Sequence, residues 1–225
     1  MKAAVSWSGG LESSLACHKA ITEGHDVACL VTFVLDPYWP AMGHPPQIMR
    51  LQSESIGIPH IMIKVEEPYK EGYREAIASL MKTWGIEGIV TGDIYVVDDT
   101  HGNWMESVCE GLDIEVIMPL WDRDTLQVLD EEMSEGFRAV FTCVKQPWFG
   151  EEWIGRELNK DTVKDLLALV DNQGMDPCGE NGEYHTMVID GPIFKEVVKI
   201  PKFTKQKHNS RFFMKVTETN SHIQY

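Results

Sequence analysis

Two short segments of the chain gather most of the residues that could do chemistry. The first, residues 8–14, reads S-G-G-L-E-S-S and follows a short apolar run. Its glycines would let the backbone approach a phosphate closely, and the first N–H groups of a following helix would point at that phosphate. The hydroxyls of Ser8, Ser13 and Ser14 would add further donors. The segment therefore predicts an anion-binding loop suited to the phosphates of a nucleotide.

The spacing of the glycines separates this loop from two common phosphate-binding motifs. It matches neither G-x-x-x-x-G-K-S/T nor G-x-G-x-x-G, so the P-loop kinase and dinucleotide-binding interpretations both fail. Glycine-rich turns between a strand and a helix are common, and the loop alone does not select one class of enzyme.

The second segment, residues 178–186, reads C-G-E-N-G-E-Y-H-T. It places two carboxylates, an amide, an imidazole and two hydroxyls within nine residues. A polar run of this composition often forms a solvated turn, here leading into a strand over residues 187–190. The other interpretation is a cluster of acid-base groups, because carboxylates and imidazoles commonly transfer protons in enzymes.

Strands and helices alternate along the first half of the chain. Apolar runs predict strands at residues 1–7, 25–34, 60–64, 88–91 and 115–118, and helical periodicity predicts helices at 15–23, 47–56, 69–84 and 104–111. Such alternation is typical of a parallel sheet covered on both faces, an α/β fold. Ligands of these folds bind beyond the carboxyl ends of the strands, so the loop, Thr32, Gly92 and Asp93 are expected to border one pocket.

The character of the chain changes after about residue 121. We expect helices at residues 124–134 and 162–172, begun by Asp124 and Asp161 as N-caps, and strands at 138–144, 187–190, 197–200 and 212–217. This mixture predicts a smaller α+β domain over residues 123–225 that packs on an α/β domain over residues 1–122.

The net charge of the chain limits the classes of partner that it is expected to bind. There are 20 Lys and Arg against 35 Asp and Glu, and the net charge of −15 argues against a broad nucleic-acid surface. No apolar run approaches the roughly 20 residues that span a bilayer, and the first residues do not resemble a signal peptide, so we expect a cytoplasmic protein with no membrane partner. The five cysteines contain no C-x-x-C pair, which disfavours a disulfide scaffold or a structural zinc site.

Both segments resemble the motifs of one family. Residues 8–14 are similar to the S-G-G-x-D-S loop of the N-type ATP pyrophosphatases, the PP-loop. Residues 178–186, followed by Asp190-Gly191-Pro192, are similar to the C-terminal signature of the diphthine–ammonia ligase family. Further matches follow in order along nearly the whole chain to about residue 200: Glu71-Gly72-Tyr73, Gly92-Asp93, Glu106, Cys109 and Pro119-Leu120-Trp121.

This resemblance implies a fold and a reaction. The fold would be a Rossmann-like domain of the adenine-nucleotide alpha hydrolase type, which carries the PP-loop, with a smaller α+β domain. The enzyme would be an ATP-dependent amide ligase that adenylates the carboxylate of diphthine, a modified histidine of elongation factor 2. Ammonia would then displace AMP to give diphthamide. The partners would be ATP, Mg²⁺, ammonia or ammonium and the acceptor, and a homodimer is left open.

The resemblance also implies roles for individual residues. ATP would be bound by the loop and two neighbouring strand ends, namely Ser8, Gly9, Gly10, Glu12, Ser13, Ser14, Thr32 and Gly92. Glu12 and Asp93 would hold Mg²⁺, which prefers oxygen ligands. Four residues would serve catalysis by orienting ammonia or the acceptor: Glu180, Asn181, Glu183 and His185. A carboxylate or His185 would take a proton from ammonium, and an unperturbed histidine, with a pKa of about 6.5, suits that near neutral pH.

The chain departs from the family pattern at three positions. Glu12 stands where the loop usually has Asp, and Asn181 and His185 replace a Gly and a Glu of the diphthamide branch. The same chemistry on another carboxylate, for example in cobalamin salvage, is therefore an alternative. A sulfur-transferring or tRNA-modifying ATP pyrophosphatase would usually need two working cysteines, and only Cys178 is suitably placed. A nucleotide-binding module without turnover would have no need of the second polar segment.

Other polar and aromatic groups have simpler interpretations. Asp98 and Asp99 could bind a metal, but an adjacent pair more often forms a solvated turn, and His101 in the same loop could line the pocket. The aromatic side chains of residues 148, 149 and 153 could stack on adenine, but we expect Trp148, Phe149 and Trp153 in the core.

Overall fold

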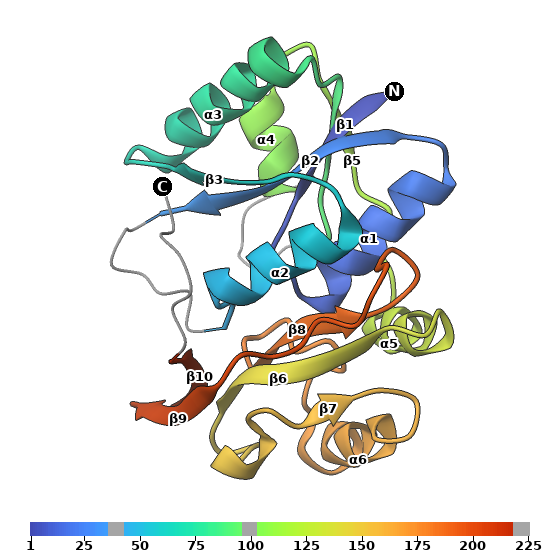
Figure 1. The fold of residues 1–225 in the computed structure, drawn as a ribbon, viewed down its shortest axis with the longest axis vertical. Helices are drawn as coiled ribbons and strands as arrows, with labels where there is room; N and C mark the ends of the chain where they lie inside the picture. Colours follow the sequence, from blue (N-terminus) through green and yellow to red (C-terminus); the bar gives the residue numbers. More distant parts are fainter. Residues whose placement is uncertain (36–42, 96–102, 218–225) are drawn as a thin grey trace.

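The computed structural model describes residues 1–35, 43–95 and 103–217 of the chain (Figure 1). Within these ranges the first half of the chain forms one sheet with its helices, and the second half forms another. The candidates Asp98, Asp99 and His101 lie outside the described residues. No helix in the described ranges combines the length and the apolar character needed to cross a membrane.

The first sheet is parallel, as the alternation of strands and helices predicts. Its order is β3-β2-β1-β4-β5, and every neighbouring pair is parallel. The strands are β1 (Lys2–Ser6), β2 (Asp26–Val34), β3 (His60–Lys64), β4 (Gly88–Val90) and β5 (Glu115–Ile117). Strands are added on one side of β1 up to β3 and on its other side from β4 onward. This reversal is a switch point of the kind at which parallel sheets bind ligands, and the α/β fold class is confirmed.

Helices cover both faces of the first sheet (Figure 1). The face toward the second sheet carries α1 (Leu11–Thr22) and α2 (Pro46–Ile56), and the other face carries α3 (Tyr69–Trp84) and α4 (Trp104–Cys109). The central strand is therefore buried on both sides, and Ala3, Ala4 and Val5 are inaccessible to solvent. Helix α3 begins and ends at the predicted residues, because Ile77 and Leu80 face the core at helical spacing.

The second sheet is antiparallel, and with its helices it forms the α+β half of the chain. Its order is β7-β6-β10-β9, and β8 also pairs with β6. The elements are α5 (Thr125–Ser134), β6 (Arg138–Lys145), η1 (Glu151–Trp153), β7 (Glu157–Leu158), α6 (Val163–Gln173), β8 (Tyr184–Asp190), β9 (Phe203–His208) and β10 (Arg211–Val216).

The two halves share one hydrophobic core. Strand β8 contacts α1 and α2, and α5 lies beside α1, where Lys19 Nζ and Glu131 Oε1 are 2.6 Å apart. Fully buried side chains continue from Val5 in β1 through Leu15 in α1 to Met187 in β8. The second half is therefore held against the face of the first sheet on which the loop of residues 8–14 opens.

Several expected elements differ from those of the structure, and two of the differences have a clear local reason. Helix α1 begins at Leu11 rather than at residue 15, because the glycine-serine loop runs directly into the first turn. Residues 197–200 form no strand, although Val198 N donates to Ile189 O at 2.8 Å. Val197 is 46% exposed while Val198 is buried, and this local alternation resembles a strand without a partner to complete a ladder. The last hairpin is formed instead by β9 and β10.

The expected N-cap of α6 is also wrong, whereas that of α5 is right. Asp124 caps α5, where its Oδ1 accepts from Gln127 N at 3.0 Å. Thr162 occupies the N-cap position of α6, and Asn159 Oδ1 accepts from the N–H groups of Asp161 and Thr162 at 2.9 and 3.2 Å. The asparagine turn before the helix thus takes the place of the predicted aspartate cap.

The aromatic side chains near residue 150 pack in the core, as expected. Phe149 and Trp153 are buried and lie against Phe141, with ring centroids 6.1 and 5.1 Å from it. Trp148 is partly buried and packs against the same cluster. Aromatic rings in this arrangement bury a large apolar area and stabilise the second sheet.

Candidate functional site

A cavity of about 1080 Å³ lies between the carboxyl edge of the first sheet and the second half of the chain. It is lined by most of the residues that the sequence nominates, namely Ser8, Gly10, Glu12, Ser13, Thr32, Gly92, Asp93, Glu180 and His185. The other nominated residues, Gly9, Ser14, Asn181 and Glu183, are not among its lining residues. The fold therefore brings the two polar segments to one cavity although about 170 residues separate them.

The loop of residues 8–14 is held in shape by its own hydroxyls. Ser14 Oγ donates to Gly10 O at 2.8 Å and Ser13 Oγ donates to the same oxygen at 3.2 Å. Ser8 Oγ accepts from Gly10 N at 3.2 Å and donates to Ser13 Oγ at 3.0 Å. Gly10 offers no side-chain cap, so the first N–H groups of α1 remain available to an anion.

Gln52, which the sequence analysis missed, fastens this loop to the second sheet. Its side chain is fully buried, and Nε2 donates to Gly9 O at 2.9 Å and to Val188 O at 2.8 Å. Its Oε1 accepts from Trp7 Nε1 at 3.2 Å. The signal was a lone amide on the apolar face of α2, beside Met49. Because the buried amide makes all three of these hydrogen bonds, it holds the loop rigidly.

Two glycines are required by close approaches at the loop. Gly9 has a φ of +76°, and a Cβ there would lie 2.4 Å from Gln52 Oε1. Gly92 follows β4, and a Cβ there would lie 2.8 Å from the backbone of Glu12 and of Ser13. The chain after β4 thus touches the first turn of α1, which seals the switch point between β1 and β4.

Thr32 lines the cavity near the end of β2 and contacts His60, the first residue of β3. Thr32 Oγ1 donates to Trp7 O at 2.5 Å and lies 2.8 Å from His60 Nε2. Burial lowers the pKa of His60 to about 4, so the ring is neutral near pH 7. The Thr32 hydroxyl therefore joins β1 to β2 at the edge of the cavity.

Asp176 organises the second polar segment. Its Oδ1 accepts from Cys178 N at 2.8 Å and from Glu180 N at 3.3 Å, and its Oδ2 accepts from Thr125 Oγ1 at 3.0 Å. The sequence analysis overlooked Asp176, although an aspartate two residues before a cysteine-glycine pair is a recognisable turn signal. This carboxylate holds the backbone that presents Glu180.

The four nominated catalytic residues occupy different environments. Glu180 lines the cavity, whereas Asn181 is exposed beside it. Glu183 is 2% exposed, and its Oε1 accepts from Asp176 N at 3.2 Å. Glu183 therefore supports the turn of the segment, and Glu180 is the carboxylate that faces the cavity.

Negative charge accumulates around Glu180. Burial raises the pKa of Glu180 to about 8, and the carboxylates of Glu12, Asp176 and Asp93 add to the rise. Burial also raises the pKa of Glu12 to about 7. Both groups can thus exchange a proton near neutral pH, which is the property expected of an acid-base catalyst.

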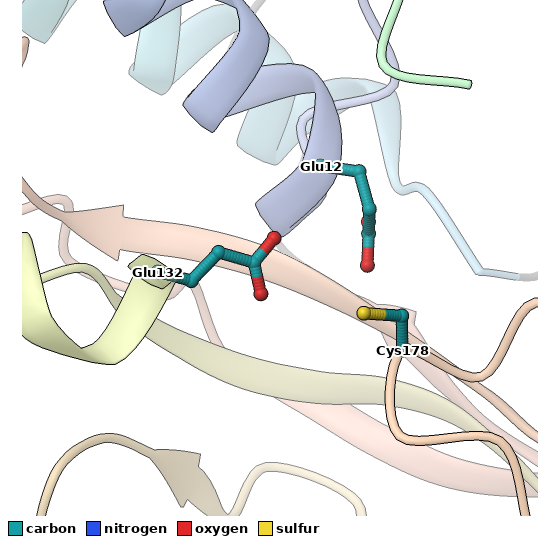
Figure 2. Close-up of side chains that lie close together, drawn as sticks. All are labelled: Glu12, Glu132 and Cys178. Atoms are coloured by element: carbon teal, nitrogen blue, oxygen red, sulfur yellow. The ribbon is translucent and has the colours of Figure 1, made fainter. Parts of the chain in front are cut away.

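Glu12 also belongs to a group of three ligand atoms that the sequence did not suggest. Figure 2 shows the carboxylates of Glu12 and Glu132 and the thiol of Cys178 pointing toward one another from α1, α5 and the second polar segment. Their ligand atoms lie within 4.8 Å of one another. Asp93, the expected partner of Glu12, is exposed on the cavity wall, and its Oδ2 accepts from Asn103 Nδ2 at 3.1 Å.

His185 does not have the near-neutral pKa that the sequence suggested. Burial, with a contribution from Arg211, lowers the pKa of His185 to about 4. Its ring centroid lies 5.0 Å from that of His44, whose pKa is lowered to about 3 by burial and by His185 itself. His185 is therefore neutral throughout the range in which enzymes usually work, and the expectation of a base that titrates near pH 6.5 is wrong.

The lowered pKa values of His185 and His44 predict that the fold loses stability in acid. Each has a folded-state pKa below its unfolded value of about 6.5, so the unfolded chain binds more protons as the pH falls. The stability that these neutral rings contribute is therefore complete above about pH 6.5 and is lost as the pH falls toward 4. We expect His185→Gln to remove about 2 kcal/mol of the stability lost between about pH 7 and about pH 5, measured by urea denaturation. The exposed His208→Gln should keep the wild-type dependence, and an unchanged dependence in His185→Gln would contradict a buried neutral ring.

Family models match both halves of the chain. Residues 1–116 match the model described as diphthamide synthase N-terminal domain, and residues 124–221 match the model described as diphthamide synthase C-terminal domain. Together the two matches leave only a short connection and the last residues uncovered.

Curated relatives named diphthine–ammonia ligase are similar over nearly the whole chain. The proteins from Mus musculus and Homo sapiens are each 24% identical, over 96% of this chain and 89% of their own length. The protein from Danio rerio is 25% identical, over 93% of this chain and 90% of its own length. Among solved structures, a predicted subunit of tRNA methyltransferase from Methanocaldococcus jannaschii overlaps with a TM-score of 0.45 and 16% identity, over 85% of this chain and 98% of that chain.

Proposed function

The chain belongs to the diphthamide synthase family, and on that premise we propose that it is an ATP-dependent ligase that joins ammonia to a carboxylate. The observation that carries the proposal is the shared cavity. Residues of the loop and Glu180 both line it, so a segment that would bind phosphates and a carboxylate that would transfer protons face one space. The names of the curated relatives support the ligase activity.

The first chemical step would be adenylation of the acceptor. A carboxylate oxygen attacks the α-phosphorus of ATP, the bond to the β-phosphate oxygen breaks, and pyrophosphate leaves. The N–H groups at the start of α1 receive no side-chain cap from Gly10, and they would stabilise the charge that develops on the leaving pyrophosphate. Because Gln52 and the serine hydroxyls already hold the loop in shape, these donors need little reorganisation.

The second step would be attack by ammonia on the acyl-adenylate. The new C–N bond forms as the bond to AMP breaks, and the nitrogen must lose a proton to give the amide. We assign the acceptance of that proton to Glu180, whose pKa of about 8 suits proton transfer near neutral pH. His185, neutral at that pH, would orient the acceptor by a hydrogen bond.

Mg²⁺ is expected with ATP, and the residues on the cavity wall fit it. Glu12 and Asp93 both line the cavity and offer carboxylate oxygens, the ligands that Mg²⁺ prefers beside substrate phosphates. Bound there, the ion would neutralise part of the phosphate charge. Asn103 would position Asp93 through its hydrogen bond to Oδ2.

For the acceptor we propose diphthine, in line with the names of the relatives, and we propose elongation factor 2 as the protein that carries it, as the family resemblance implies. A different carboxylate is the second candidate, because two positions of the second segment depart from the diphthamide branch. One of them, His185, lines the cavity and is uncharged where that branch has a glutamate. The change removes a negative charge from beside the acceptor, which favours a different or more acidic substrate.

The experiment is a turnover assay with isotope-labelled ATP and ¹⁵N-ammonium. The assay is run with diphthine-bearing elongation factor 2 and with a panel of small carboxylates, including cobalamin precursors. We expect AMP and pyrophosphate in equal amounts and ¹⁵N in the product amide for one acceptor. If ADP and phosphate appear instead, or if ATP binds but no acceptor elicits AMP, the ligase proposal is wrong and a nucleotide-binding module remains.

A further inference from the structure

Glu132 is a buried carboxylate that has no hydrogen-bond partner in the described part of the chain. Its side chain is 0% exposed, and neither Oε1 nor Oε2 has a hydrogen-bond partner among the described residues. It lies on α5 next to Val128 and Leu129 in the buried face, where the helical pattern would normally place an apolar residue. A buried carboxylate in this state is costly unless a cation or a donor meets it.

The surroundings of Glu132 supply negative charge rather than a counter-charge. Lys19 and Arg123 bond to the neighbouring Glu131 at 2.6 and 2.5 Å, and no ion pair joins either of them to Glu132 in the described part of the chain. The groups that face Glu132 from other elements include the Glu12 carboxylate and, farther along the second segment, Glu180. This arrangement is one that a small cation would complete.

The thiol of Cys178 limits which cation fits. Cys178 Sγ donates to Thr125 O at 3.2 Å, so the thiol carries its proton. A zinc ion would require a thiolate and the loss of that hydrogen bond. Ammonium requires neither, because a thiol sulfur can still accept weakly. Its tetrahedral N–H donors, with hydrogen bonds of about 2.9 Å, would place acceptors about 4.7 Å apart, and the three ligand atoms lie within 4.8 Å of one another.

The position of the group relative to the cavity suits a substrate rather than a structural ion. Glu12 and Cys178 line the cavity, whereas Glu132 is not among its lining residues. A cation between the three would therefore be seated in the wall of the cavity that Glu180 also lines. A carboxylate has two oxygens, so Glu12 can contribute to this site and to Mg²⁺ together.

We propose that Glu132, Glu12 and Cys178 form the site that binds ammonium before it is delivered to the activated carboxylate. The assignment rests on the proposed ligase function for its purpose, but the binding itself does not require turnover. Glu132 is the anchor of the site, because its carboxylate has no hydrogen-bond partner within residues 1–35, 43–95 and 103–217. Glu12 and Cys178 complete the coordination from the cavity side.

The test measures ammonium binding without ATP or acceptor. Thermal denaturation of the wild-type chain is followed in ammonium chloride and in tetramethylammonium chloride at equal ionic strength. Binding to the folded state alone raises the melting temperature with ligand concentration. We expect a rise with ammonium and none with tetramethylammonium, which cannot donate hydrogen bonds. Glu132→Gln and the apolar Glu132→Met should abolish the rise, whereas Glu135→Gln, an exposed change at the C-cap of the same helix, should retain it.

Kinetics supply the second readout. In Glu132→Gln the KM for ammonium should increase about tenfold or more while the KM for ATP stays within about twofold, a tenfold change being worth about 1.4 kcal/mol. Equal stabilisation of the wild type by both salts, or a zinc-specific stabilisation, would overturn the ammonium site. Ammonium binding without ligase activity would leave the site intact and refute the proposed function. Ligase activity with an unchanged KM for ammonium in Glu132→Gln would support the proposed function and refute the ammonium site.

Discussion

Replacing Glu180 with Gln is expected to lower amide formation about 100-fold or more, because the only cavity-lining carboxylate of the second segment could no longer accept a proton. The amide is nearly the same size, and the backbone N–H of residue 180 would still donate to Asp176 Oδ1. The segment should therefore keep its shape. ATP affinity, measured by equilibrium binding, should change no more than about threefold, or less than about 0.7 kcal/mol.

Asp171→Asn is the matched control for this prediction. It removes one carboxylate of the same half of the chain, at an exposed position at the end of α6. Turnover of this variant should equal that of the wild type. Wild-type turnover in Glu180→Gln would rule out proton transfer by Glu180, and a parallel loss of ATP affinity would instead indicate a role in nucleotide binding.

The second large effect is expected at Gly10. A Cβ at this position would lie 3.4 Å from Glu12 Oε2, from Ser8 Oγ and from Thr186 O, which is ordinary contact on the inner side of the loop. The backbone φ is −76°, so a side chain is tolerated there without strain. Gly10→Trp should therefore leave the protein folded while its ring fills the space for the phosphates. We expect ATP affinity to fall about 100-fold or more, equivalent to about 2.7 kcal/mol.

Gly10→Ala is the control that distinguishes the loss of space for the phosphates from the loss of the glycine itself. Its single methyl group fits the same contacts, so ATP affinity should stay within about threefold of the wild type. Melting temperature and circular dichroism would establish that both variants are folded. Tight ATP binding by a folded Gly10→Trp protein would show that the phosphates lie elsewhere in the molecule.

Local patterns in the sequence are sufficient to predict the strands of the first sheet and the loop that follows the first of them. Residues 60–64 and 69–84 were predicted with the boundaries observed, because apolar periodicity is a local property of the chain. The nucleotide loop could be read from glycine and serine for the same reason. The resemblance to the family likewise depended on short motifs, and the family models match both halves of the chain.

Which polar residues lie together depends on contacts between elements that are far apart in the sequence, and these contacts exist only in the folded chain. Gln52, Asp176 and Glu132 were overlooked because each looks ordinary in its own segment and gains its meaning from partners on other elements. Helix α5 brings Glu132 to Glu12 from about 120 residues away, and no local pattern encodes that approach.

The ionisation of the site was also beyond the sequence. His185 was expected to titrate near neutral pH, but burial lowers its pKa to about 4, whereas burial and neighbouring carboxylates raise that of Glu180 to about 8. A pKa depends on solvent access and on the charges within a few ångströms, and folding sets both. Residue types and spacing thus determined the chemistry that this chain can attempt, and the packing of its two halves decided which side chains are charged, which are held, and which face the cavity.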